Sequence, residues 1–343
     1  NNSTIKTFTN KENGLIIGNG NGIQFNNSTI ENFTNCGIVV SNNKYGLEIN
    51  GKSTIENFSN QGTITSNGDN TESIYSPVGL QLYDANINTL INKGLIDNGI
   101  RIIQSTINNL NNQGTINNKS QGRKNAAILL ANLNGQATVI KTLTNSGTIK
   151  ADNASGILIE AGNTIENLTN SGTIEASLYG IGFYTVDKYG EEIDLGQINL
   201  ESNSVIKAGQ DGIHIDGGDR GIKAKGIDVQ KGAKVEGGNA GIFIGDGKQL
   251  DTLIKISGEV KGGVAGIINE GVIGSSSDGQ ESGIKVEGGG SIASANGGSG
   301  IVNQGNGSIQ GDIVVSGGGA IEGGITNTGK GEISGSITVE EGS

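Results

Sequence analysis

The chain has 343 residues, a length that fits one large domain or two ordinary ones. Only 33% of it is hydrophobic and 3% aromatic, and 61 residues are glycine, which argues against a thick globular core. A formal net charge of -11 argues against nucleic acid or an anionic membrane as the main partner. The single cysteine, Cys36, excludes an intrachain disulfide and a metal site built from cysteines.

No apolar run approaches the ~20 residues that a membrane-spanning helix requires. The chain begins with Asn1 rather than methionine, and its first residues do not form a signal peptide. We take this to indicate a processed protein or an internal fragment. The last apolar group, residues 337–339, is followed by no readable cap, so we expect the natural protein to continue.

Residues 1–186 repeat an asparagine-rich motif, Thr-Ile-Glu-Asn-[Phe/Leu]-[Thr/Ser]-Asn, which is clearest at 29–35, 54–60 and 164–170. Most copies continue into Gly-Thr-Ile, as at 62–64. A Gly-apolar-x-apolar group, such as 156–159, follows before the next copy. Each cycle therefore predicts three short strands separated by Gly or Asn turns, within the length range of solenoid repeats.

Residues 187–197 interrupt this pattern as a loop insertion, and residues 198–343 resume it with glycine as the main turn residue. One such cycle places its strands at 227–229, 233–235 and 242–244. Strands this short find backbone partners only when turns stack in register, at a spacing of ~4.8 Å. We therefore predict one continuous all-β domain over 1–343. It is a single-stranded, right-handed parallel β-helix with three short strands per rung and about 13 rungs.

Within the motif, Ile165 is out of phase with Leu168 for a flat strand, which predicts a bend near Asn167. The last asparagine of each motif copy would stack on its counterpart and form an internal hydrogen-bonded ladder at one corner. The predicted ladder residues are Asn35, Asn60, Asn92, Asn112, Asn145 and Asn170.

Differences in cycle length predict external loops at 66–77, 119–125, 187–195 and 274–282. Two of them carry side chains typical of contact surfaces, although exposed Tyr and Arg also occur on inert surfaces. The contact candidates are Arg123 and Lys124 in one loop, and Tyr184, Tyr189, Glu191 and Glu192 in and beside another.

The tandem motif, with Gly-Ile-x-[Ile/Val] groups between its copies, resembles the passenger domains of bacterial autotransporters (type V secretion). It is most similar to the asparagine-rich passengers of epsilon-proteobacterial adhesins. The resemblance spans nearly the whole chain. It implies export through a natural C-terminal β-barrel beyond these residues. It also implies display at the bacterial cell surface or outer membrane, or release as a secreted protein.

A second cluster surrounds the only histidine. Asp211, His214, Asp216 and Asp219 lie close together in the sequence, and carbohydrate-cleaving β-helix enzymes use carboxylate clusters for acid/base work. The alternation with Ile213 and Ile215 turns His214 outward. The same residues also fit an ordinary solvated surface, because β-helix active sites draw on several adjacent rungs.

We therefore expect a non-catalytic adhesin or self-association rod that works without a cofactor or a metal. Its partners would be a protein or glycan of a host cell surface, or other copies of itself, joined by many weak contacts. The alternative is a polysaccharide lyase or hydrolase that uses Asp211, His214, Asp216 and Asp219.

Overall fold

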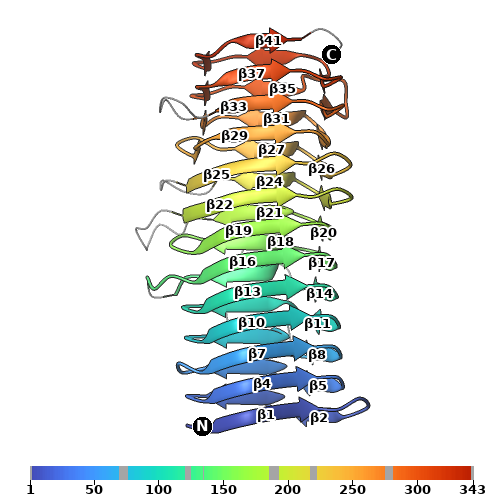
Figure 1. Ribbon diagram of the computed structural model, residues 1–343, viewed down its shortest axis with the longest axis vertical. Coiled ribbons are helices and arrows are strands. Elements are labelled where there is room, and N and C mark those ends of the chain that lie inside the picture. Colours follow the sequence, from blue (N-terminus) through green and yellow to red (C-terminus); the bar gives the residue numbers. More distant parts are fainter. Residues whose placement is uncertain are drawn as a thin grey trace. The chain divides into compact units, whose positions relative to one another are not determined.

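The computed structural model describes residues 2–68, 76–119, 125–133, 135–184, 193–216, 222–274 and 281–340. In these ranges every regular element is a β-strand, and no helix is present that could cross a membrane. The strands wind into a right-handed parallel β-solenoid with three strands per turn, as the repeats predicted (Figure 1). It has about 11 turns, slightly fewer than the about 13 expected from the repeat length.

The chain divides into two compact units. The first comprises residues 1–166 with 174–177, and the second comprises residues 167–173 with 178–343. Strands β19 (Thr164–Asn170) and β20 (Thr173–Ala176) contain residues of both units.

The first unit has three parallel sheets, each taking one strand from every turn. Its sheet A contains β1 (Thr4–Asn10), β4 (Thr29–Asn35), β7 (Thr54–Asn60), β10 (Asn86–Asn92), β13 (Thr106–Asn112) and β16 (Val139–Asn145). Its sheet B contains β2 (Leu15–Gly18), β5 (Ile38–Ser41), β8 (Thr63–Ser66), β11 (Leu95–Asp97), β14 (Thr115–Asn118) and β17 (Thr148–Ala151). Its sheet C contains β3 (Ile23–Asn26), β6 (Leu47–Asn50), β9 (Leu80–Tyr83), β12 (Ile100–Ile103), β15 (Ala126–Ala131) and β18 (Ser155–Glu160).

The turns of this unit stack so that equivalent motif positions lie directly above one another. Ile30 pairs with Ile55, and Phe33 pairs with Phe58, along β4 and β7. These four side chains are buried, and the rings of Phe33 and Phe58 stack at 4.7 Å between centroids. The interior is therefore a column of like side chains, in which the few aromatic residues also find a place.

The motif strands bend, and the bend lets both Ile30 and Phe33 enter the core although three residues separate them. The paired register runs from Ile30 directly to Asn32 and skips Glu31, whose side chain is exposed. Glu31 is the counterpart of Glu166 in the copy at 164–170. The bend thus falls one motif position before the Asn167 position predicted from the sequence.

The second unit repeats the three-sheet pattern. Its sheet A contains β22 (Ile193–Leu200), β25 (Ile222–Val229), β28 (Gln249–Leu250), β29 (Leu253–Ile256), β32 (Val272–Ile273), β33 (Gly283–Val286), β36 (Ser308–Ile309), β37 (Asp312–Val315), β40 (Glu332–Ile333) and β41 (Ile337–Val339). Its sheet B contains β23 (Val205–Ala208), β26 (Lys234–Gly237), β30 (Glu259–Gly262), β34 (Ser291–Ser294) and β38 (Ala320–Ile321). Its sheet C contains β21 (Ile181–Tyr184), β24 (Asp211–Ile215), β27 (Ala240–Ile244), β31 (Ala265–Asn269), β35 (Ile301–Asn303) and β39 (Ile325–Asn327).

In this unit sheet A takes two short strands from one turn. The long strand β25 pairs with β28 through Lys223 and Ala224, and with β29 through Ile227 to Val229.

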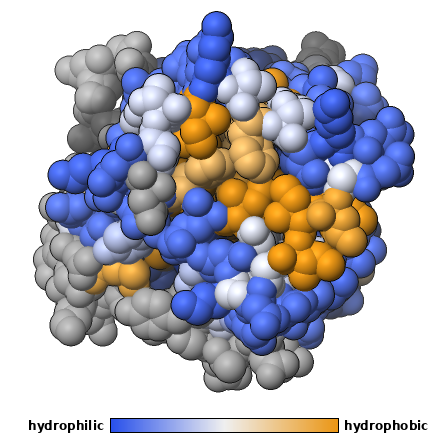
Figure 2. Space-filling model, turned by 90° about the horizontal axis from the view of Figure 1, so that it is seen from below, coloured by the Kyte–Doolittle hydropathy of each residue, from blue (hydrophilic) through white to orange (hydrophobic). Residues whose placement is uncertain are grey.

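Apolar atoms are visible at the face of the first turn. Figure 2 shows an apolar centre ringed by hydrophilic side chains.

Apolar side chains are also exposed on the outward side of sheet B. Leu15 and Ile17 of β2 are each 59% exposed, and Ile38 of β5 is exposed beside them. These three residues occupy the outward positions of their strands, whereas Val39 between outward neighbours is fully buried.

Candidate functional site

The histidine cluster is partly assembled on sheet C of the second unit. Nδ1 of His214 lies 2.7 Å from Oδ2 of Asp211, and both residues belong to β24. The other carboxylate oxygen, Oδ1, accepts hydrogen bonds from the side-chain amide of Asn239 at 2.8 Å and from the backbone N–H of Ala240 at 2.9 Å. Asp211 is only 3% exposed, so its carboxylate is buried and bonded on both oxygens.

The ring of His214 lies between two aromatic rings. Its centroid is 3.8 Å from that of Tyr179 and 5.1 Å from that of Phe243, and both pairs are nearly parallel. Phe243 follows from the register, in which His214 pairs with Gly182 on one side and with Phe243 on the other. Tyr179 precedes β21 and was not anticipated from the sequence.

The predicted catalytic set is therefore divided. Asp211 and His214 are joined, but no hydrogen bond in the described part of the chain links Asp216 to either of them. Asp219 lies outside the described residues. A carboxylate engaged by His214, Asn239 and Ala240 is poorly placed to move a proton, and its bonds to Asn239 and Ala240 tie β24 to the next rung. The described ranges contain no cluster of three His, Cys, Asp or Glu side chains suited to a metal ion.

The predicted contact loops cannot be placed in the same way. Arg123, Lys124, Tyr189, Glu191 and Glu192 lie outside the described residues, and Tyr184 is described only as the last backbone position of β21. The greater parts of the four predicted loops, residues 69–75, 120–124, 187–192 and 275–280, are likewise outside the described ranges.

Asparagine side chains form a buried ladder in the first unit. Asn35 Nδ2 donates to Asn60 Oδ1 at 2.8 Å, and the same bond recurs in each following turn. The series runs Asn10, Asn35, Asn60, Asn92, Asn112 and Asn145, with distances of 2.7–2.8 Å. The ladder thus begins at Asn10, which is outside the set predicted from the sequence.

In the second unit the predicted ladder residue Asn170 donates to Ser204 Oγ at 2.5 Å. A further ladder, not predicted from the sequence, joins Asn269 to Asn303 and Asn303 to Asn327, each at 2.7 Å. The signal was the spacing Asn269-x-Gly271, which repeats Asn35-x-Gly37 among glycine-rich residues.

A buried arginine on the outward side of sheet C was also missed. Arg101 of β12 is 2% exposed, and its Nη1 lies 3.4 Å from Oε1 of Gln81. Burial lowers the pKa of Arg101 to about 10, while the nearby Tyr45 and Glu160 oppose this shift. The guanidinium therefore remains charged at neutral pH. The sequence signal was a basic residue between two core isoleucines.

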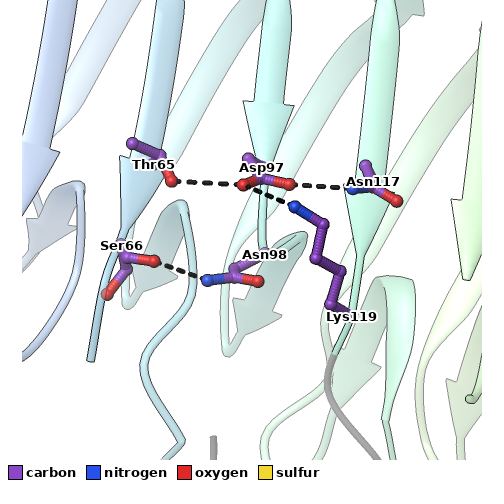
Figure 3. Close-up of polar contacts among 6 residues, drawn as sticks. All are labelled: Thr65, Ser66, Asp97, Asn98, Asn117 and Lys119. Atoms are coloured by element: carbon purple, nitrogen blue, oxygen red, sulfur yellow. Dashed lines mark hydrogen bonds and ion pairs between the residues drawn. The ribbon is translucent and has the colours of Figure 1, made fainter. Parts of the chain in front are cut away.

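Outward polar side chains form hydrogen-bonded rows on the first unit. On sheet B, Asp97 of β11 accepts from Asn117 Nδ2 at 2.8 Å, from Thr65 Oγ1 at 3.5 Å and from Lys119 Nζ at 3.5 Å (Figure 3). Thr65 and Asn117 belong to the strands on either side of β11. The row therefore crosses three successive turns.

Sheet A of the same unit carries a groove with a volume of about 870 Å³. It crosses β1, β4, β7, β10 and β13 at the part of each strand that precedes or includes the bend. It is lined by Thr4, Ile5, Lys6, Thr29, Ile30, Glu31, Thr54, Ile55, Glu56, Asn86, Ile87, Asn88, Thr106 and Asn108. Along it, Asn88 Nδ2 donates to Glu56 Oε1 at 2.6 Å, and Asn108 Nδ2 donates to Asn88 Oδ1 at 2.9 Å.

No protein-family model matches the chain, and comparisons with curated proteins and with solved structures found no match either. Conclusions about its function therefore depend on the chemistry of its own surfaces.

Proposed function

We propose that the chain is the passenger domain of a bacterial autotransporter, displayed at the cell surface or secreted, and that it acts as a non-catalytic adhesin or self-association rod. The tandem motif supports the passenger assignment. The observation that carries the adhesive role is the set of outward polar rows, of which the Thr65–Asp97–Asn117 row is one.

Rows of this kind suit adhesion because each turn presents similar groups at the same place. The exposed pair Asn57 and Asn32, joined at 3.0 Å, forms another short row on sheet A. A single hydrogen bond to such a group contributes little net binding energy in water. A surface that makes many of them at once binds through avidity, with no need for a deep pocket.

The test is to display the full chain on a bacterium that does not adhere, and to measure clumping and attachment to epithelial cells. The double substitution Asp97→Ala and Asn117→Ala should reduce at least one of the two. The control is Gln113→Ala, which removes an exposed amide of the same unit from the turn between β13 and β14, away from these rows. A displayed chain that supports neither clumping nor attachment would refute the adhesive role.

The contact of 2.7 Å between Asp211 and His214 favours one alternative, a polysaccharide lyase or hydrolase on the same scaffold. Incubation with acidic and neutral glycans, followed by detection of new reducing or unsaturated ends, separates the two functions. Turnover that disappears in Asp216→Ala would establish the enzyme and exclude a purely adhesive protein.

A further inference from the structure

The groove on sheet A of the first unit has the dimensions of a site for an extended chain. It crosses five successive strands. At ~4.8 Å per turn, the distance from the first strand to the fifth is about 19 Å. Its floor is fixed, because Ile30, Ile55 and Ile87 are buried in the core beneath it.

The polar groups of the groove recur from turn to turn, and three of them are held by hydrogen bonds to one another. One row presents the hydroxyl groups of Thr4, Thr29, Thr54 and Thr106, with the amide of Asn86 between the last two. A parallel row presents carboxylate and amide groups, in which Asn88 joins Glu56 and Asn108 in one hydrogen-bonded chain. Side chains that are already ordered lose little conformational entropy when a ligand binds.

The spacing of these rows distinguishes between two kinds of extended ligand. An extended peptide advances ~3.3 Å per residue and would fall out of step with the turns after one or two residues. The ~4.8 Å spacing of the turns is close to the rise of one sugar unit in an extended β-linked glycan. In the turns of β4, β7 and β13 a sugar would meet a hydroxyl together with a carboxylate or an amide, whereas β1 offers Lys6 in place of the carboxylate and β10 offers Asn86 in place of the hydroxyl.

The charge of the groove distinguishes between neutral and acidic glycans. Its charged side chains are Glu31, Glu56 and Lys6, so that carboxylates outnumber ammonium groups. Carboxylates accept hydrogen bonds from sugar hydroxyls, whereas they repel the carboxylates or sulfates of an acidic polymer.

From these observations we propose that the groove binds a single neutral β-linked glycan chain, with one sugar unit per turn. This inference rests on the proposed adhesive function and names the ligand class of one adhesive surface.

The experiment is calorimetric titration of the purified full chain with β-1,4-linked gluco-oligosaccharides of increasing length, and with oligogalacturonides as the acidic counterpart. Affinity for the neutral series should rise with each added sugar and level off when the ligand spans the five strands. The double substitution Thr54→Ala and Glu56→Ala should weaken binding of the longest neutral ligand by about tenfold.

The repeat supplies a matched control for this experiment. Glu166 holds the same motif position as Glu56 and is exposed, but it does not line the groove. Glu166→Ala should bind as the unsubstituted chain does. Circular dichroism of each variant shows that the solenoid has formed.

Several outcomes would overturn the inference. They are the absence of oligosaccharide binding, equal loss in Glu166→Ala and in the groove variant, preference for oligogalacturonides, or capture of peptides in the groove. If displayed chains still make cells adhere in any of these cases, the inference fails while the adhesive function stands. If oligosaccharides bind as expected but displayed chains support no adhesion, the adhesive function fails and the groove remains a glycan site.

Discussion

The side-chain amide of Asn35 donates to Oδ1 of Asn60 at 2.8 Å, and Asn60 in turn donates to Asn92 at the same distance. Each amide also donates to a backbone carbonyl of the next turn, such as that of Thr63 at 3.2 Å for Asn35. A single buried side chain therefore satisfies polar groups of two turns at once. Satisfied networks of this kind fix the register between strands.

Asn60→Ala should destabilise the first unit by about 2–3 kcal/mol, because it leaves Asn92 Oδ1 without its donor and opens a small cavity. Asn57→Ala is the control in the same strand. It removes an exposed amide, and its effect should stay within about 0.5 kcal/mol. Urea unfolding followed by circular dichroism measures both, and equal losses would contradict a special role for the inner ladder.

Phe58→Ala should cost about 3–5 kcal/mol, because the ring is buried and stacks on Phe33. Phe58→Leu should cost only about 1–2 kcal/mol, because the paired position one turn further is Leu90, which is also buried. Thermal unfolding of the two variants measures which one loses more stability. If Phe58→Leu loses as much as Phe58→Ala, the column of stacked side chains requires an aromatic ring at this position.

Gly62→Ala should destabilise the first unit by about 2 kcal/mol or more. The added Cβ would overlap the carbonyl oxygen of Gly37 in the preceding turn, and the backbone there would have to move. Gly20→Ala provides the comparison, because its Cβ would meet no heavy atom within 4 Å. The midpoint of urea unfolding should fall for Gly62→Ala and remain nearly unchanged for Gly20→Ala.

In the second unit, Glu287 accepts from Lys255 at 2.9 Å and from Lys285 at 3.2 Å. The hydrogen bond from Lys255 lowers the pKa of Glu287, and the bond to Glu287 raises the pKa of Lys255. The stabilisation from Glu287 is therefore present above its unfolded-state pKa and is lost as the pH falls through its folded-state value. That from Lys255 is lost as the pH rises through its own folded-state value.

Lys255→Met should consequently flatten the acid side of the stability profile. The loss should be less than about 1 kcal/mol, because both side chains are partly exposed to solvent. Urea unfolding at a series of pH values provides the measurement. An unchanged profile at acidic pH would show that the pair contributes nothing.

Much of the scaffold could be predicted from the sequence because identical turns must stack in register. The motif copies at 29–35 and 54–60 placed Ile on Ile, Phe on Phe and Asn on Asn, as the structure has them. The same register pairs His214 with Gly182 on one side and with Phe243 on the other.

The sites were harder to predict because they depend on where side chains leave the regular strands. Tyr179 reaches His214 from outside a strand, and strand pairing cannot reveal such a contact. The groove lies where the strands bend at the Glu31 position, and the sequence placed that bend one motif position later. Asp97 looked like an ordinary polar position until the structure placed Thr65 and Asn117 beside it.

Consecutive members of the inner ladder are separated by as few as 20 residues and by as many as 33, yet the bond between them measures 2.8 Å in the first case and 2.7 Å in the second. The hydrogen bond between turns therefore forms whatever the number of residues that connect them. Gene duplication or deletion of a whole coil should be tolerated whenever it begins and ends at a ladder asparagine. A protein that evolves by gaining and losing whole turns could change its external loops rapidly while its core stays constant.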